Sequence, residues 1–325
     1  MQIVLDTRGL QMSVRNKCFL IAFEKNASIV HPDKVGSILI TAPCRISSPA
    51  LILAAENQIP VVICNNSGKP SARIWSPHFI NISTLRRGQY QFSVSLQGLN
   101  WAEDIINLKI AGQIETLNFL ADHFDQLRDK LKGVIPGINF QAQKQQIRNE
   151  QTDLPTYKKK ILFTEAYAAA QYWQLAGMYL PMPFAFHKRS KRPARDITNV
   201  CINYLYGMLR NETETAILSI GMDPALGIIH RDGYHMPSLV FDLMEPFRPI
   251  VDQQLFAAII KNTIPHDICL QEGESLILNK AGRKVLIKIF TGLLYGKITY
   301  RNKTNTMRNH ILTEAKQLAT LISKS

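Results

Sequence analysis

The hydrophobic pattern of this chain changes its period once, near Ser83, and this change constrains the fold more than any other feature. Before that point, short runs rich in β-branched and aromatic residues alternate with turn-prone residues, a pattern typical of β-strands. After it, apolar residues recur every three or four positions, a pattern typical of helices. The sequence therefore predicts an α+β fold, with a small β-rich N-terminal domain followed by a larger all-α C-terminal domain.

The predicted boundaries follow the same change of period. We expect a β-rich domain over residues 1–80, a linking helix or loop over 81–100, and a helical domain over 101–325. The expected strands are 3–5, 18–23, 37–41, 61–64 and 72–75, with one short helix at 50–56. The expected helices are 85–94, 101–131, 164–179, 197–220, 238–260 and 311–323. Residues 133–160 are polar and interrupted by glycine and proline, which predicts a loop with room for one short helix.

Composition limits the class of protein. Of the 325 residues, 46% are apolar and 19% are charged, as in ordinary globular proteins. The start lacks a basic leader with an apolar core, and no apolar run approaches the length of a membrane span, so we expect a cytoplasmic protein with no membrane association. The five cysteines are scattered without a C-x-x-C pair, which argues against a zinc ribbon or a disulfide framework.

The charge balance favours a polyanionic partner. Lys and Arg outnumber Asp and Glu by 38 to 25, giving a formal net charge of +13. Basic clusters at 158–160 and 187–192 flank Glu165, and the C-terminal part of the chain is also basic. A solvated surface is the simpler interpretation of any one cluster. Several clusters around acidic residues favour nucleic acid.

Two acidic residues, Asp242 and Glu245, lie three positions apart in an apolar segment. One helical turn separates them, so both are expected to point the same way. Buried carboxylates need a positive partner, which is either a divalent metal ion or a basic side chain. Pro246 removes a backbone donor and predicts a bend beside the acids. The alternative is a simple surface contact between Glu245 and Arg248.

Glu165 and His230 are candidates for the same site. Glu165 begins a helix whose corresponding face carries mostly small residues, and His230 follows the turn 221–229. Each signal is weak alone, because a first-turn Glu suits the helix dipole and a lone His is more often a core residue. One His with two or three carboxylates suits Mn²⁺ or Mg²⁺ better than structural zinc. Such an ion would support phosphodiester chemistry.

Taken together, several motifs resemble those of the CRISPR-associated integrase, the catalytic subunit of CRISPR spacer acquisition. They are Thr164-Glu165-x-x-Ala168-Ala169-x-x-Tyr172-Trp173, Asn199 with Tyr204 and Tyr206, the turn Gly221-Met-Asp-Pro-Ala-Leu-Gly-Ile-Ile-His230, and Ser238-Leu-x-x-Asp242-Leu-Met-Glu245-x-Phe-Arg248. The N-terminal likeness, Ile46-Ser47-Ser48 with Asn66-Ser67-Gly68, is looser. Ala166 and Met222 depart from the family pattern, and neither replaces a ligand.

The resemblance implies a metal-dependent DNA endonuclease and integrase with catalytic residues Glu165, His230, Asp242 and Glu245. Of these, Glu165, His230 and Glu245 are the implied ligands of Mn²⁺ or Mg²⁺, while Asp242 is a further active-site acid. The implied substrate is double-stranded DNA, namely the prespacer and the CRISPR repeat. The implied assembly is a homodimer that forms a heterohexamer with a small ferredoxin-like adaptation protein.

The DNA contacts are less specific. We expect Lys188, Arg189, Arg192 and Arg248 to contact DNA, although Arg248 could instead neutralise Glu245. Two other functions remain open from the sequence. The first is a metal-dependent nuclease that cuts branched or single-stranded DNA without integrating it, and the second is a catalytically inert DNA-binding scaffold.

Overall fold

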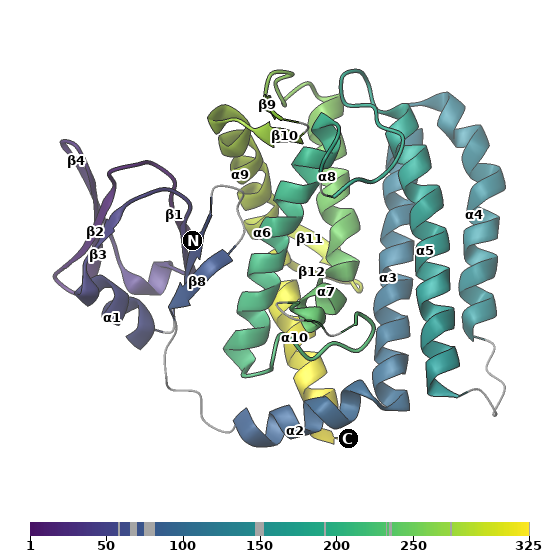
Figure 1. The fold of residues 1–325 in the computed structure, drawn as a ribbon, viewed down its shortest axis with the longest axis horizontal. Coiled ribbons are helices and arrows are strands. Elements are labelled where there is room, and N and C mark those ends of the chain that lie inside the picture. The colour runs from purple at the N-terminus through teal and green to yellow at the C-terminus, as the bar shows by residue number, and fades with distance from the viewer. Residues whose placement is uncertain are drawn as a thin grey trace. The chain divides into compact units, whose positions relative to one another are not determined.

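The computed structural model describes residues 1–57, 59–65, 70–74, 82–146, 153–191, 193–231, 233, 236–273 and 275–324. The chain divides into two compact units, Met1–Asn81 and Ile82–Ser325. The first is rich in strands and the second is mostly helical, as Figure 1 shows. The predicted α+β fold class is confirmed.

The N-terminal unit contains two four-stranded sheets. Its elements are β1 (Gln2–Leu5), β2 (Gln11–Arg15), β3 (Cys18–Phe23), β4 (Asn26–Val30), β5 (Ser37–Ile40), β6 (Arg45–Ile46), α1 (Ser48–Glu56), β7 (Val61–Cys64) and β8 (Pro70–Ile74). The first sheet has the order β1-β5-β7-β8, with β8 antiparallel to its neighbour and the other pairs parallel. The second has the order β4-β3-β2-β6. Residues of both sheets and of α1 share one apolar core that includes Ile38, Phe19 and Ala50.

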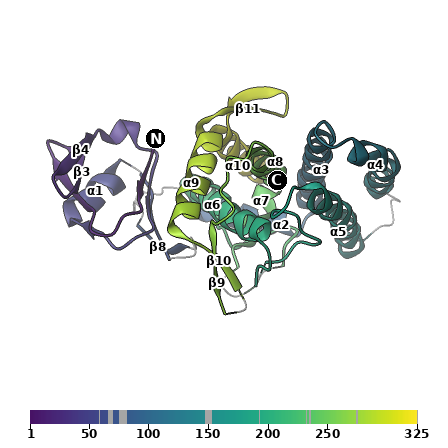
Figure 2. The ribbon, with the colours of Figure 1, turned by 90° about the horizontal axis from the view of Figure 1, so that it is seen from above.

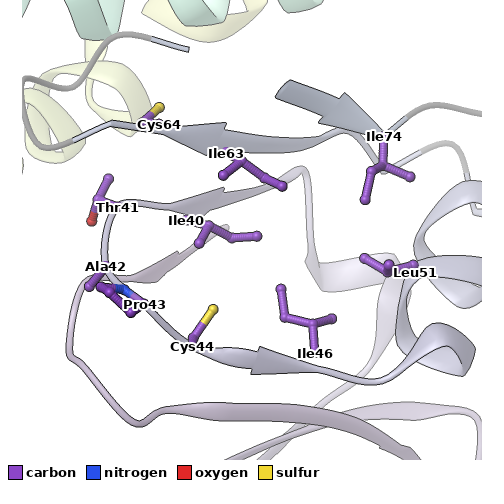
Figure 3. A pocket seen from close by; sticks show the side chains of 10 residues that line it. All are labelled: Ile40, Thr41, Ala42, Pro43, Cys44, Ile46, Leu51, Ile63, Cys64 and Ile74. Atoms are coloured by element: carbon purple, nitrogen blue, oxygen red, sulfur yellow. The ribbon is translucent and has the colours of Figure 1, made fainter. Parts of the chain in front are cut away.

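A cavity of about 430 Å³ lies in the N-terminal unit. Figure 3 shows its lining, which comes from β5, β6, β7, β8, α1 and the turn after β5 and is mostly apolar. Cys44 and Cys64 contribute thiols, and burial raises the pKa of Cys44. Among the described residues, this lining contains no carboxylate, amine or imidazole group. We therefore assign no chemistry to it.

The helical unit holds the larger core. Its helices are α2 (Ile82–Ser93), α3 (Leu96–Ala121), α4 (Asp125–Gln146), α5 (Leu154–Tyr179), α6 (Ile197–Ile220), α7 (Ser238–Met244), the 3₁₀ turn η2 (Glu245–Phe247), α8 (Arg248–Ile260), α9 (Lys280–Tyr295) and α10 (Met307–Lys324). The helices α3, α4 and α5 lie side by side (Figures 1 and 2). Two hairpins, β9 (Cys269–Glu272) with β10 (Ser275–Leu278) and β11 (Lys297–Tyr300) with β12 (Lys303–Thr306), add strands that the sequence did not predict.

The segment expected to be a loop is largely helical. Helix α4 continues to Gln146 with Pro136 inside it, and α5 begins at Leu154. The side chain of Asp153 accepts a hydrogen bond from the N–H of Thr156 at 3.1 Å, which caps the start of α5. Packing of α4 against α3 and α5 overrides the weak helix propensity of the glycines and the proline.

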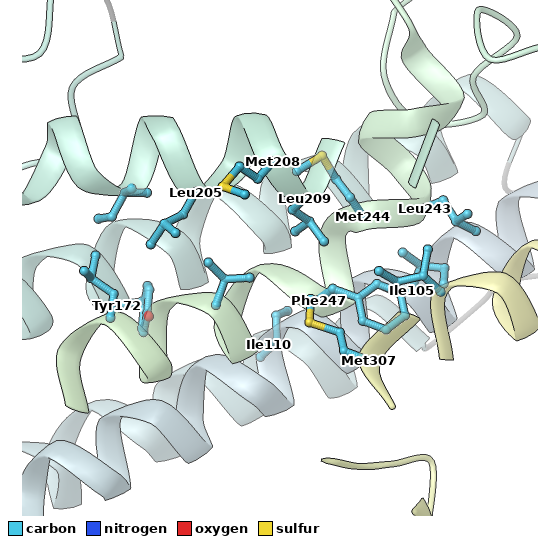
Figure 4. Close-up of a cluster of buried hydrophobic side chains, with 14 of the residues drawn as sticks. Ile105, Ile110, Tyr172, Leu205, Met208, Leu209, Leu243, Met244, Phe247 and Met307 are labelled. Atoms are coloured by element: carbon cyan, nitrogen blue, oxygen red, sulfur yellow. The ribbon is translucent and has the colours of Figure 1, made fainter. Parts of the chain in front are cut away.

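The core of the helical unit surrounds the segment that carries the two acids. Figure 4 shows Phe247 packed among side chains of α3, α6 and α10, including Ile105, Leu209 and Met307. Each large side chain of this kind stabilises the fold by about 1.5–3 kcal/mol when fully buried. The segment Ser238–Phe247 is therefore fixed by packing on several helices.

Among the helices of the described residues, none has the length and hydropathy of a membrane span.

Candidate metal centre

The candidate centre is assembled from five parts of the helical unit. Helix α5 carries Glu165, α7 carries Asp242, and η2 begins with Glu245. His230 lies in the turn that precedes α7, and Lys109 projects from α3. Because α3 packs against both α5 and η2, residues distant in sequence meet at one place.

A change in helix geometry separates Asp242 from Glu245. Helix α7 ends at Met244, η2 follows, and α8 begins at Arg248. Pro246 has no N–H to donate to the carbonyl of Asp242, and the N–H of Glu245 donates to that carbonyl instead. The α-helical hydrogen bonding is therefore interrupted beside Pro246, and the two carboxylates lie in different surroundings.

Asp242 organises the turn that carries His230. Its Oδ2 accepts the backbone N–H groups of Ile228 at 2.6 Å and Ile229 at 3.1 Å. Its Oδ1 accepts the backbone N–H of His230 at 3.0 Å and lies 2.6 Å from His230 Nδ1. The Asp242 side chain is completely buried, so these contacts satisfy it within the protein. We assign Asp242 a positioning role.

His230 is held between the two acids by its two ring nitrogens. A carboxylate can only accept, so Nδ1 carries the hydrogen that faces Asp242 and the neutral ring has its lone pair at Nε2. His230 Nε2 lies 3.8 Å from Glu245 Oε1, and the ring is 35% exposed. The arrangement makes Nε2, beside Glu245, the ring nitrogen that can coordinate a cation.

Glu245 is buried and kept ionised by cations on either side. Arg248 Nη2 lies 3.0 Å from its Oε1, and Lys109 Nζ lies 2.6 Å from its Oε2. Burial alone would raise the pKa of Glu245, but the charges of Arg248 and Lys109 lower it to about 2.

Lys109 is the member of the centre that the sequence analysis missed. Its ammonium group contacts Glu165 Oε1 as well as Glu245, although its side chain is only 9% exposed. The signal was a single basic residue on the apolar stripe of α3, beside the buried residues Ile106 and Ile110. A charged residue at such a position requires an acidic partner.

Within the described part of the chain, no three His, Cys, Asp or Glu side chains form a preassembled metal site. Two of the expected ligands, Glu165 and Glu245, contact the Lys109 ammonium group. The donor types nevertheless fit a hard divalent ion, because they are two carboxylates on one ammonium group and an imidazole nitrogen 3.8 Å from Glu245. Glu245 Oε2 is buried without a well-aligned hydrogen bond, and the Lys109 ammonium group lies 2.6 Å from it. Metal ligation by Glu165, His230 and Glu245 stays a prediction.

Comparison with known proteins assigns the family. The family model described as CRISPR associated protein Cas1 matches residues 3–291. The chain belongs to the Cas1 family. This Cas1-family chain is 27% identical to CRISPR-associated endonuclease Cas1 1 of Archaeoglobus fulgidus over 336 aligned residues, which cover 99% of this chain and 96% of that relative.

Two solved structures share the Cas1 fold. A casposase bound to integration product matches with a TM-score of 0.81 at 23% identity, over 100% of this chain and 91% of that chain. A chain of a Cas6-RT-Cas1–Cas2 complex matches with a TM-score of 0.78 at 20% identity, over 100% of this chain and 35% of that longer chain. The family resemblance drawn from the sequence is confirmed by the match to the family model.

A second buried network of this Cas1-family chain includes two of the motif residues. The hydroxyl groups of Tyr172 and Tyr206 donate hydrogen bonds to Asp252, which is 1% exposed. The Arg248 guanidinium lies 5.0 Å from the centre of the Tyr206 ring, a cation–π contact. Asp252 thus supports, through Tyr206, the arginine that contacts Glu245.

The four residues expected to contact DNA have different surroundings. Lys188 is exposed, as a phosphate contact requires. Arg189 donates hydrogen bonds to Asn199 and Asn203 within the protein, and Arg248 is paired with Glu245. Arg192 lies outside the described residues. The DNA contacts stay predictions, and Lys188 has the surroundings that suit one best.

Proposed function

We propose that this chain is the metal-dependent DNA endonuclease and integrase of CRISPR adaptation, which inserts short DNA segments into a repeat array. The observation that carries the proposal is that Glu165 and Glu245 contact the same ammonium group, with His230 Nε2 3.8 Å from Glu245 Oε1, in a helical unit of Cas1 fold. The A. fulgidus relative is named an endonuclease, and the similar casposase structure is described as bound to an integration product. Both names support chemistry on phosphodiester bonds.

Glu165, His230 and Glu245 are the residues proposed to hold Mn²⁺ or Mg²⁺. When bound, such an ion polarises a phosphoryl oxygen and stabilises the charge that develops on it. The chain's own residues prepare the donors. Asp242 keeps the His230 lone pair at Nε2, and the positive charge of Arg248 helps to keep Glu245 ionised.

The proposed reaction is a transesterification. The 3′-hydroxyl oxygen of the captured DNA forms a bond to a phosphorus atom at the repeat boundary, and the bond from that phosphorus to the repeat's own 3′ oxygen breaks. The attacking hydroxyl loses a proton and the leaving oxygen gains one. The number of phosphodiester bonds is unchanged, so the reaction needs no ATP.

The proposed partners are double-stranded DNA, a second copy of the chain, and a small ferredoxin-like adaptation protein in a heterohexamer. The net charge of +13 supports DNA binding through phosphates, which predicts affinity that falls strongly with salt. The similar chain in the Cas6-RT-Cas1–Cas2 complex supports a Cas2-type partner.

A strand-transfer assay tests the proposal against a plain nuclease. The purified chain is mixed with the partner protein, a short duplex with free 3′-hydroxyl ends, and labelled repeat DNA in Mn²⁺. We expect a joined product that is longer than the labelled strand. Cutting of the repeat without any joined product would favour a nuclease that does not integrate.

Substitution of His230 tests the proposal against an inert scaffold. His230→Ala should abolish strand transfer and leave duplex affinity unchanged, because the side chain serves the metal and not the phosphates. The exposed His123 provides a matched control, and His123→Ala should transfer strands as the wild type does. Unchanged strand transfer by His230→Ala would contradict the assignment of the centre.

A further inference from the structure

Lys109 occupies the point where the proposed metal ligands meet. Its ammonium group contacts one carboxylate oxygen of Glu165 and lies 2.6 Å from one of Glu245. The side chains of Lys109 and Glu245 are 9% and 4% exposed, so water screens their charges little. A buried lysine is costly without such partners. The geometry therefore makes Lys109 part of the charge balance of the site.

The formal charges of the four closest groups cancel. Glu165 and Glu245 contribute two negative charges, and Lys109 and Arg248 contribute two positive ones. Without the ammonium group, the two carboxylates would repel each other. A divalent ion added to the balanced site would instead face an ammonium group already on its ligands. The ion and the ammonium group cannot share the same oxygens at low cost.

The structure also indicates which cation leaves. Both oxygens of Glu245 are in use, since Arg248 lies 3.0 Å from Oε1 and Lys109 lies 2.6 Å from Oε2. The planar guanidinium of Arg248 also packs over the ring of Tyr206. Lys109 has a flexible four-carbon stem and makes point-charge contacts. It is therefore the cation that can withdraw from the site without breaking a stacked contact.

We propose that Lys109 is a resident counter-cation of the metal centre, which a divalent ion must displace from Glu165 and Glu245. The inference rests on the proposed function for the identity of the ligands. It adds that the site is neutralised from within when no metal is bound, and that this neutralisation weakens metal binding. Removal of a residue that only holds the ligands in place would weaken metal binding. Removal of Lys109 should instead strengthen it.

Calorimetric titration of Mn²⁺ into the DNA-free protein tests the inference. Lys109→Met and Lys109→Gln remove the charge and keep much of the side-chain volume. Both should bind Mn²⁺ with a Kd roughly tenfold or more below that of the wild type, because they remove the competing ion pair. Lys316 is an exposed lysine on α10, and Lys316→Met should bind Mn²⁺ as the wild type does.

A measurement on the wild type covers the case in which both variants fail to fold. Mass spectrometry follows acetylation of Lys109 by an amine reagent with and without Mn²⁺. Acetylation should be slow without the ion and at least severalfold faster with it, while that of Lys316 stays constant. An unchanged rate at Lys109 would overturn the inference.

The outcomes separate the inference from the proposed function. Folded Lys109 variants that bind Mn²⁺ no more tightly than the wild type overturn the inference and leave the metal site intact. A wild-type protein that binds no Mn²⁺ overturns the proposed metal site and the inference with it. Thermal unfolding in a chelating buffer establishes which variants are folded.

Discussion

Asp242 and Glu245 approach His230 at opposite ring nitrogens, Asp242 at 2.6 Å from Nδ1 and Glu245 at 3.8 Å from Nε2. The two acids therefore have different tasks, although they are one helical turn apart in sequence. Asp242 accepts hydrogen bonds from the backbone of the turn, whereas Glu245 contacts the cations Lys109 and Arg248. This difference makes the role of each acid separately testable.

Asp242→Asn should weaken metal binding by about 10- to 100-fold and lower strand transfer with it. An amide has one acceptor oxygen, so its NH₂ group must face either the N–H groups of Ile228 and Ile229 or His230 Nδ1. The first orientation leaves buried donors unpaired, which costs about 1–3 kcal/mol each. The second moves the ring hydrogen to Nε2 and removes the lone pair. Mn²⁺ calorimetry and strand transfer measure the effect.

Asp267 is an exposed aspartate of the same unit and provides the control for this substitution. Asp267→Asn should match the wild type in both assays. If Asp242→Asn bound Mn²⁺ as tightly as the wild type, Asp242 would not determine the orientation and tautomer of His230.

Gly227→Ala should disturb the turn that carries His230. A methyl group at this position would lie 2.5 Å from Ser238 Cβ and 3.0 Å from the carbonyl oxygen of His230, so the backbone has to shift. We expect a loss of about 1–3 kcal/mol in the free energy of unfolding and a matching loss of strand transfer. Chemical denaturation and the strand-transfer assay provide the two measurements.

Gly207 in α6 provides the matched control, since a methyl group there meets no atom of the described chain within 4 Å. Gly207→Ala should stabilise the protein by up to about 1 kcal/mol, because alanine favours a helix interior. Equal effects of the two substitutions would show that close packing at Gly227 does not govern the turn.

The fold brings Glu165, His230, Asp242 and Glu245 together, whereas their role as a metal site stays a prediction. The carboxylates in apolar segments were a signal in the sequence because buried acids require partners. Helix α4 was missed because Pro136 and its glycine neighbours act as breakers in isolated segments, whereas packing against α3 and α5 decides the matter here. Tertiary contacts of that kind cannot be derived from local pattern alone.

The partners of the acids were also beyond the sequence. A buried carboxylate requires a cation, but only the fold determines that Lys109, more than fifty residues before Glu165, supplies it. The different roles of Asp242 and Glu245 likewise depend on the turn at Ile228–His230, whose backbone N–H groups face one acid and not the other. Spacing along the helix could not distinguish them.

Arg248→Met should lower the free energy of unfolding by about 2–4 kcal/mol, because it leaves Glu245 buried with one fewer cation. Arg248→Lys should give an intermediate loss, since it keeps the charge and loses the planar contact with Tyr206. A loss of DNA affinity by Arg248→Met at unchanged stability would assign Arg248 to the DNA instead.

Lys188→Met should leave stability unchanged and reduce the salt dependence of DNA affinity by about one phosphate contact.

Asp252→Asn tests the buried tyrosine network through pH. Burial raises the pKa of Asp252 from 3.8 to about 7, although the hydrogen bonds from Tyr206 and Tyr172 oppose the rise. The folded protein therefore retains a proton that the unfolded chain releases above about pH 4, so stability falls as pH increases from about 4 to 7. The full effect on the free energy of unfolding is on the order of 4 kcal/mol.

Asparagine at position 252 still accepts hydrogen bonds and does not titrate. The variant should therefore gain stability relative to the wild type across this range and show a constant difference above it. Urea denaturation at a series of pH values measures this difference, with Asp267→Asn as the control, and a difference independent of pH would contradict the raised pKa.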